Sequence, residues 1–432
     1  MRGERSGGPL VARAGWRYAL IFALYAQQGL VAGFALTAVP NHFAALGASA
    51  QAIGAHVAMV GLPWILQPLW GPVVDRFGGF AMGRRRAWVV GALVASLLAL
   101  ARLLLVEDGA AAVLPAISAV FLVQSAFAAL TDTATDGLII DHTPAAQLGK
   151  ANALTRMGFV GGGAAGAALF AWMLPAQGLH ASALVLLGTG TAVLGLQLLV
   201  REGAGDAVLS LRRSPDRLAA QAGFSGLLRH LLDGLRGGGT LLLLGFCFAT
   251  DFASAAFRLP LGVELIQGRG WAAEELSRLQ ALMGLGTGTA GALLIGWWTD
   301  RAGPGTALGV LLRLCGTAYL VSGAVLLLPE PGWAAVAAPL ALGLSTVLPA
   351  LLFVALAPAV MRASLGPSAA TRFALFMATL NMGDVAGSAV AGDAAAVLGL
   401  PALGLAAGVL FLACVPFRRR LAGVPVAATR GR

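Results

Sequence analysis

The stretch WGPVVDRFGGFAMGRRRAW, at residues 70–88, decides the fold because it gathers charge between two long apolar segments. It holds four arginines and one carboxylate, Asp75, whereas the sequence on either side is almost entirely apolar. Part of its pattern returns in GWWTDRAG at residues 296–303, which repeats the Gly, Asp, Arg and Gly of GPVVDRFG at residues 71–78. Charge confined to short loops, and a loop that occurs twice, both need an explanation from the rest of the chain.

Composition explains the confinement of charge. Of 432 residues, 58% are hydrophobic and only 11% are charged, which is too few for the surface of a soluble protein. Apolar runs of about 20 residues cross a bilayer, and they cross it as helices because lipid offers the backbone no hydrogen-bond partner. The sequence therefore predicts an all-α membrane protein with twelve transmembrane helices. The predicted spans are 18–38, 51–74, 87–106, 110–131, 157–179, 181–200, 240–263, 279–299, 306–328, 333–360, 373–396 and 400–417.

The net charge of +10 is distributed in a way that excludes a nucleic-acid partner. Most of the 29 lysines and arginines lie in the segments on the same side as the N-terminus, whereas the loops on the other side hold only Arg269 and Arg278. This is the positive-inside asymmetry, which predicts that both termini are cytoplasmic. We therefore expect a multi-pass protein of the inner (plasma) membrane, in contact with the lipid bilayer and monomeric.

The returning fragment indicates an internal repeat. Gly71 and Asp75 correspond to Gly296 and Asp300, and the pair Met157-Gly158 recurs as Met382-Gly383 at the same offset. Parallel repeats of six helices build transporters that rock about a site at the membrane midplane. The sequence thus predicts a first six-helix bundle at 1–200, a cytoplasmic linker at 201–239 and a second bundle at 240–432. Within the linker, apolar residues at helical spacing over 224–235 predict an amphipathic helix on the inner leaflet.

These loops resemble a known family. The pattern G-x-x-x-D-R-x-G after the second span is similar to the signature loop of the major facilitator superfamily, and the resemblance covers the whole chain. LPWILQPLWGPVVDRFGGFAMGRRRAW and TDTATDGLIID further resemble one branch, the AmpG-like muropeptide permeases with their acetyl-CoA-transporter and ferric-siderophore-permease relatives. This branch implies uptake of a fairly large, polar and often anionic solute. A lysine that such relatives often carry shortly before the acid of the seventh helix is absent before Asp251.

The signature loop implies a latch on the cytoplasmic side. In the family, a loop similar to this one closes that side when the protein opens outward. A carboxylate there can accept hydrogen bonds from the start of a neighbouring helix, and arginines can hold the loop at the anionic leaflet. We expect the latch and gate to be formed by charged residues of the two repeated loops and of the cytoplasmic end of the fourth helix. These candidates are Asp75, Arg76, Arg84, Arg85, Arg86, Asp132, Asp136, Asp300 and Arg301.

Glycine spacing predicts close helix contacts. Three predicted spans carry small-xxx-small faces, which let helices approach closely in lipid. The glycines are Gly158, Gly162 and Gly166 in the fifth span, Gly284 and Gly288 in the eighth, and Gly383 and Gly387 in the eleventh. The resemblance implies that the second, fifth, eighth and eleventh helices meet between the halves. The faces can therefore serve this seam, or simply tight packing within the bundle.

Charge inside the spans is the best indication of the working site, because an ionisable group at the bilayer centre costs about 2.5–3.5 kcal/mol on insertion scales. Helical rise places Asp251 and Asp384 near the midplane, and Arg102 and Arg258 further outward. Asp251 and Arg258 share one helix face but are separated by about 10 Å of rise, so a substrate, water or another helix must lie between them. The neutral side chains Gln28 and Gln124 complete the set of candidate substrate and proton sites.

The sequence favours transport over chemistry. No P-loop, H-E-x-x-H or G-x-S-x-G motif is present, and Cys247, Cys315 and Cys414 all lie in predicted spans, so we expect no catalytic residue, metal or cofactor. We expect a secondary transporter of a small or medium polar solute, with proton-coupled uptake as the first interpretation. Proton-driven drug or metabolite efflux is the alternative, supported by a fifth-helix glycine run that resembles the antiporter motif of the superfamily. A receptor or enzyme that transports nothing is the alternative from another class.

Overall fold

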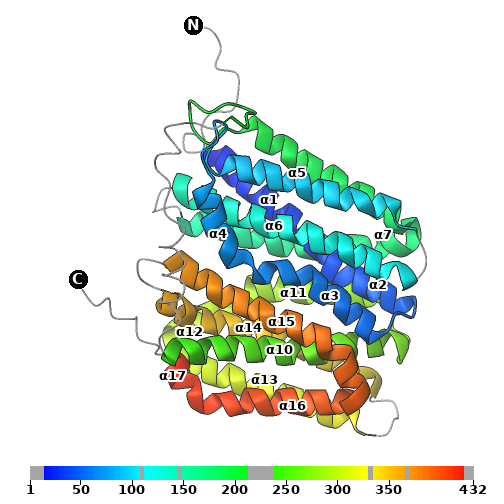
Figure 1. The fold of residues 1–432 in the computed structure, drawn as a ribbon. Helices are drawn as coiled ribbons and strands as arrows, with labels where there is room; N and C mark the ends of the chain where they lie inside the picture. The colour runs from blue at the N-terminus through cyan, green and yellow to red at the C-terminus, as the bar shows by residue number, and fades with distance from the viewer. Residues whose placement is uncertain are drawn as a thin grey trace.

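The computed structural model describes residues 14–107, 111–143, 148–212, 238–328, 334–364 and 369–422. These residues form a bundle of long helices that run side by side across the molecule (Figure 1). The start of α1 (Ala14–Gly33) and α17 (Arg418–Ala422) lie at one end, called the terminal end below. The short α2 (Val39–Ala45) lies at the opposite end, called the α2 end.

Each half of the chain contributes its own set of helices. In the first half, a π-helical turn joins α1 to α2, and five longer helices and two 3-10 turns follow. Their bounds are Phe34–Ala38 for the π turn, α3 Ala50–Ile65, α4 Gln67–Arg76, α5 Arg86–Ala101, 3-10 turns Arg102–Leu105 and Ala111–Val113, α6 Leu114–His142 and α7 Leu148–Leu199. The second half holds α10 Gly238–Gln267, α11 Ala273–Gly286, a π turn Thr287–Gly291, α12 Ala292–Ala302, α13 Pro304–Leu326, α14 Ala334–Ser364, α15 Ala369–Leu398, α16 Leu400–Cys414 and a 3-10 turn Val415–Phe417.

Eleven helices within the described ranges are long and apolar enough to cross a membrane. One of them is long enough to cross it twice. This helix, α7, contains Gly178 at φ 81° and ψ 179°, outside the helical region. Gly158 near one end of α7 contacts Phe22, and Val200 just beyond the other end packs in the cluster that holds Leu20, so both ends lie near the start of α1. The chain therefore doubles back at Gly178, and α7 supplies the fifth and sixth spans. The predicted all-α bundle of twelve spans is confirmed.

Two prolines divide the second span. Pro63 lies inside α3 and Pro68 near the start of α4, with Leu66 between them at φ −84° and ψ −1°. Proline has no backbone N–H and its ring meets the carbonyl one turn earlier, so the helix breaks at this point. The motif LPWILQPLW thus gives one span two segments, α3 and α4, which both pack against α6 and α15.

The glycine faces of the fifth and eleventh spans lie within the halves, whereas Gly288 of the eighth span faces Val160 of α7 across the seam. A β-carbon at Gly162 would overlap the carbonyl oxygen of Ala26 in α1, and one at Gly387 would overlap that of Phe252 in α10. In the fifth and eleventh spans the glycines are used for close packing within each half, which is the alternative to the seam, and of the three predicted faces only Gly288 of the eighth span lies at the seam. The seam itself joins α3 to α15 and α7 to α11, which confirms the four helices expected there. Three glycines of α3 and α15 make its closest approaches: Gly54, Gly61 and Gly392.

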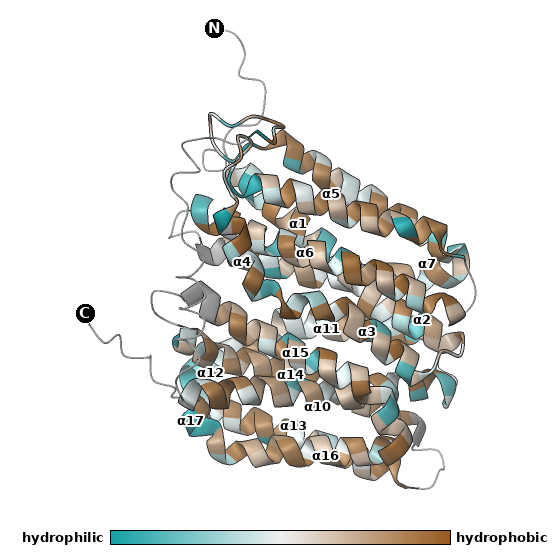
Figure 2. Cartoon of the chain, in the orientation of Figure 1, coloured by the Kyte–Doolittle hydropathy of each residue, from teal (hydrophilic) through white to brown (hydrophobic). Residues whose placement is uncertain are grey.

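Polar contacts join the two halves at the α2 end. Asn41 donates hydrogen bonds from Nδ2 to Ser277 Oγ and Gln280 Oε1, both at 2.8 Å. Gln267 donates from Nε2 to the carbonyl oxygens of Ala44 at 2.9 Å and Ala48 at 2.8 Å. Hydrogen bonds thus join the two halves directly at the α2 end. Hydrophilic residues gather at the ends of the bundle, while the middles of the helices are mostly apolar (Figure 2).

The first residues of the linker lie against the loop between the second and third spans and form backbone hydrogen bonds with it. The Ala81 N–H donates to the Arg212 carbonyl at 2.8 Å, and the Ala207 N–H donates to the Ala81 carbonyl at 3.1 Å. The amphipathic helix expected at 224–235 lies outside the described residues.

Candidate functional site

A first group of polar side chains lies inside the first half, where α6 faces α1 and α4. Asp132 and Asp136 are one helical turn apart and therefore share a face of α6. Tyr25 of α1 donates a hydrogen bond to Asp136 Oδ1 at 2.5 Å, and Gln67 at the start of α4 donates to Asp132 Oδ2 at 2.6 Å. Gln28 of α1 also hydrogen-bonds Asp132. We call these five residues the N-half acidic group.

The N-half acidic group carries two carboxylates that are held by neutral donors. Asp136 is exposed and Asp132 half-buried, although both lie inside a span. Within the described residues, no arginine, lysine or histidine hydrogen-bonds or ion-pairs with either carboxylate. An open, unneutralised pair of carboxylates can bind protons or the cationic part of a solute.

A second group lies inside the second half, where α10 faces α15. Arg258 Nη2 lies 3.5 Å from Asp384 Oδ1, and both side chains are about two-fifths exposed, at 40% and 42%. Asp251, near the middle of α10, is half-buried and interacts electrostatically with both of them. The sequence requires a substrate, a water or another helix between Asp251 and Arg258, and the structure places Asp384 of α15 beside both of them. We call these three residues the C-half acidic group.

Two predicted site residues lie elsewhere. Gln124 is buried, and its Nε2 donates to Ser96 Oγ at 3.2 Å, so it joins α6 to α5. Arg102 is exposed in the 3-10 turn that ends the third span. Among the described residues, neither forms a hydrogen bond or ion pair with a member of the two acidic groups.

The arginine cluster of the signature loop is bound to its own half. Arg86 is 1% exposed, and its guanidinium donates to backbone carbonyls at the end of α7 and in the linker, among them Gln197 at 3.1 Å and Val208 at 2.8 Å. The terminal carbonyls of a helix have no partner within the helix, and a cation near them is favoured by the helix dipole. The expected role of Arg86 in holding the loop at the lipid surface is therefore wrong, because the side chain is buried against these carbonyls.

Arg85 has a similar internal partner. Its Nε lies 3.1 Å from Asp141 Oδ2, and Arg84 reaches the same carboxylate at 3.9 Å. Asp141 and Gly137 are a turn apart on α6, and a β-carbon at Gly137 would meet the guanidinium of Arg85. α6 thus presents two neighbouring faces, with Asp132 and Asp136 turned to α1 and α4 and Asp141 turned to the loop. The structure therefore separates Asp132 and Asp136 from the arginines with which they were grouped as latch residues.

The other latch residues are at the terminal end. Arg76 and Asp300 are exposed, and the guanidinium carbon of Arg301 lies 3.9 Å from the centre of the Trp297 ring. The side chain of Asp75 lies outside what the structure describes.

Sequence reasoning missed Tyr25, Gln67, Asp141 and Glu202. The carboxylate of Glu202 accepts the backbone N–H groups of Arg85 and Arg86, both at 2.9 Å. A tyrosine and a glutamine in apolar spans are weak signals, because each can equally face lipid headgroups or a neighbouring helix. Only the packing of α1 and α4 against α6 shows that both donate to carboxylates.

The arrangement, two helical halves of six spans with polar groups between apolar helices, is that of a secondary transporter. Within the described residues, no three His, Cys, Asp or Glu side chains are grouped so as to hold a metal ion. A family profile described as Major Facilitator Superfamily matches residues 19–365. The chain belongs to this superfamily, which points to a transporter.

Solved structures of transporters share the fold across nearly the whole chain. A POT family transporter in complex with a thioalcohol-conjugated peptide has a TM-score of 0.70 at 12% identity, covering 96% of this chain and 99% of that one. The inward-open xylose transporter XylE from E. coli has a TM-score of 0.66 at 15% identity, covering 96% and 98%. The nucleoside transporter NupG has a TM-score of 0.63 at 13% identity, covering 94% and 98%. At these identities the likeness shows the fold.

Proposed function

We propose that the chain takes up a polar, anionic solute into the cytoplasm together with protons. The observation that carries this proposal is the C-half acidic group, where Arg258 pairs with Asp384 beside Asp251. Two carboxylates and one guanidinium carry a net charge of −1. When Asp384 takes up a proton, the group becomes neutral and the Arg258 guanidinium is released from its ion pair to bind an anion of the solute. A guanidinium suits carboxylate or phosphate groups because its N–H donors form a planar fork.

The orientation follows from two observations. The positive-inside asymmetry of the sequence supports a cytoplasmic terminal end and an inner-membrane location. The polar contacts of Asn41 and Gln267 close the α2 end, which would face outward. The described conformation is then inward-facing, and solute bound at Arg258 would leave toward the cytoplasm. The transporter would work as a monomer within the bilayer.

For the cargo, the resemblance to the AmpG-like branch supports a muropeptide-like solute first and a ferric-siderophore-like solute second. Both classes carry anionic or metal-chelating oxygen groups on a large polar body, and such groups suit the guanidinium of Arg258.

The signature loops fit a latch that is open in this conformation. Asp300 is exposed at the terminal end, as expected for a carboxylate that is engaged when this end closes. We propose that Asp75 and Arg76, with Asp300 and Arg301, close this end in the outward-facing state. At equal membrane abundance, Asp75→Asn should slow transport, and Asp300→Asn should slow it less. Unchanged transport by Asp75→Asn would refute the latch.

Efflux of a cationic drug or metabolite is the second candidate, and the N-half acidic group favours it. Asp132 and Asp136 offer two carboxylates to a cation without a basic residue beside them in the described part of the chain. The direction of transport and the charge of the solute separate the two candidates.

The test is transport by purified protein in proteoliposomes with an imposed pH gradient. Muropeptides, ferric siderophores and cationic drugs are offered in turn, and the wild type is compared with Asp251→Asn and Asp384→Asn. Asp393→Asn is the matched control, because it removes an exposed carboxylate from the same helix as Asp384. We expect an inside-alkaline gradient to drive accumulation of an anionic solute by wild type and Asp393→Asn, and expect both other variants to lose this accumulation. Gradient-driven accumulation that persists in both variants contradicts the proposed coupling, and outward movement of cationic drugs alone favours efflux.

A further inference from the structure

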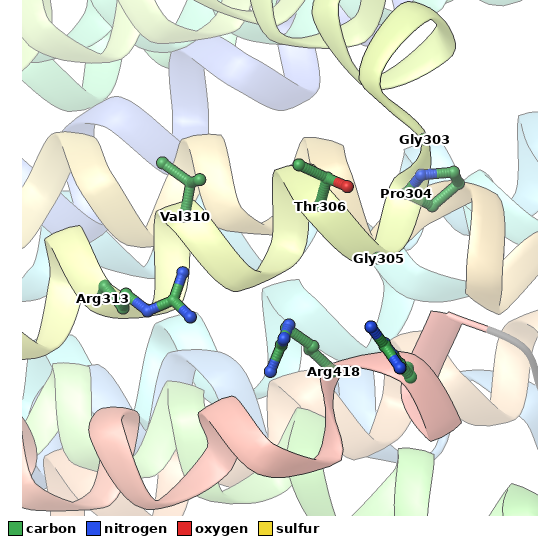
Figure 3. A pocket seen from close by; sticks show the side chains of 8 residues that line it. Gly303, Pro304, Gly305, Thr306, Val310, Arg313 and Arg418 are labelled. Carbon is green, nitrogen blue, oxygen red and sulfur yellow. The ribbon is translucent and has the colours of Figure 1, made fainter.

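A pocket of about 310 Å³ lies at the terminal end of the second half, apart from both acidic groups. It is formed between the start of α13 and the segment where α16 gives way to α17 (Figure 3). A β-carbon at Gly309 would overlap Cδ of Arg418, so this glycine lets the arginine lie directly against α13. The pocket is thus built by close approach of two helices that belong to the same half.

Three arginines line the pocket: Arg313 from α13, and Arg418 and Arg419 from α17. Figure 3 shows the side chains of Arg313 and Arg418 extending into the space between the two helices. None of the residues that line the pocket in the described structure is a carboxylate. Arg418 donates from Nη1 to the Val415 carbonyl at 3.2 Å, but within the described ranges none of the three arginines forms an ion pair. Three positive charges are therefore gathered without a counterion.

The position of Arg313 makes this gathering costly. Arg313 lies about 14 Å along α13 from its first residue, inside a membrane span. A long arginine side chain can reach back toward the membrane interface, where its charge is less unfavourable. Here it reaches a place already occupied by two other guanidinium groups. An anion held by all three guanidinium groups would offset the repulsion between them.

We propose that this pocket binds the phosphate group of an anionic phospholipid from the surrounding leaflet. Phosphate oxygens accept paired hydrogen bonds from guanidinium groups, and basic pockets between transmembrane helices bind lipid headgroups. The pocket volume falls at the lower end of the range for small-ligand sites, about 300–1,000 Å³, so it admits a headgroup phosphate with part of its glycerol.

The surroundings favour a lipid over a soluble phosphate compound as the source of the anion. Leu314, next to Arg313, is 49% exposed, and Phe417, next to Arg418, is 41% exposed. Leu314 belongs to α13, and Phe417 lies at the end of the twelfth span. Both elements lie at the edge of the bundle farthest from α5 (Figure 1). The arginines therefore border an apolar, outward-facing surface on which acyl chains can lie.

The experiment uses the full-length protein in a neutral detergent, with thermal unfolding followed by tryptophan fluorescence. Phosphatidylglycerol, phosphatidylcholine and inorganic phosphate are titrated separately at constant ionic strength. The variants are Arg313→Gln, Arg418→Gln and Arg419→Gln, and Arg420→Gln is the matched control because it removes an exposed charge from α17 outside the pocket. Arg419→Gln keeps the test valid if Arg313→Gln fails to fold, because Arg419 is exposed.

We expect phosphatidylglycerol, and not phosphatidylcholine, to raise the unfolding temperature of the wild type and of Arg420→Gln, since a ligand that binds only the folded state stabilises it. In each pocket variant, the phosphatidylglycerol concentration that gives half of the rise in unfolding temperature should increase at least about tenfold. Equal losses in Arg420→Gln and the pocket variants would show diffuse attraction and overturn the proposal. Full stabilisation by inorganic phosphate alone would overturn the lipid as the source.

Discussion

The two halves of the molecule share their scaffold but not their charges. At the offset that relates Asp75 to Asp300, Gly158 and Gly162 correspond to Gly383 and Gly387. Each pair performs the same task, because the fifth span packs on α1 through one pair and the eleventh span packs on α10 through the other. The repeat is therefore preserved where helices must approach closely.

The polar groups do not follow the repeat. At the same offset, apolar residues or glycine stand opposite each charged member of the C-half acidic group. Asp251, Arg258 and Asp384 correspond to Ala26, Gly33 and Phe159. Asp132 and Asp136 likewise correspond to Ala357 and Met361. A duplicated scaffold can thus carry two unlike sites, one with neutral donors and one with a fixed cation.

The largest expected effect tests the shared scaffold. Gly162→Leu and Gly387→Leu should each remove most of the folded protein, because the new side chain overlaps the backbone of α1 or α10. The cost should be at least the about 1–3 kcal/mol of an overpacked core. Gly161→Leu is the matched control, since nothing lies within 4 Å of a β-carbon at Gly161. Fluorescence-detected gel filtration and unfolding temperature measure the outcome. Damage in only one half would show that the two contacts are not equivalent.

The next effect tests the cation that distinguishes the second half. Arg258→Met should slow transport of an anionic solute at least tenfold, because the guanidinium is its proposed partner. Stability should change little, since an ion pair as exposed as Arg258–Asp384 contributes about 1 kcal/mol or less. Arg258→Lys should transport at an intermediate rate, because an ammonium lacks the planar fork. Initial uptake rates in proteoliposomes measure this effect. A wild-type rate in Arg258→Met would show that the C-half acidic group does not bind the solute.

The smallest effect tests the neutral donors of the first half. Tyr25→Phe removes one hydrogen bond to Asp136, and Gln67→Leu removes one to Asp132. Each should cost about 1 kcal/mol, the usual net contribution of one hydrogen bond. In an Asp136→Asn background, Tyr25→Phe should have a smaller additional effect on unfolding temperature, because the pair is coupled. Additive effects would mean that the bond contributes nothing beyond the separate side chains.

The sequence by itself determined the helical class, the twelve spans and the repeat, because apolar length and helical backbone bonding in lipid leave no other solution. Asp251, Asp384 and Arg258 were also found from the sequence, since charge inside a span is costly and therefore conspicuous. Only the tertiary structure decided which charge meets which. Arg258 reaches Asp384 and not Asp251 because α15 packs beside α10.

The same limit explains the errors. Arg86 carries the same charge as its neighbours in sequence, yet the end of α7 and the linker bury it. The glycine faces mark close contact, but nothing in their spacing tells which helix makes it. Partners across helices depend on the rotation and register of each helix in the bundle, and these are fixed by packing between segments far apart in the chain. The sequence thus specifies which charged and small residues lie inside the spans, and the packing of the bundle specifies which residues of other helices they contact.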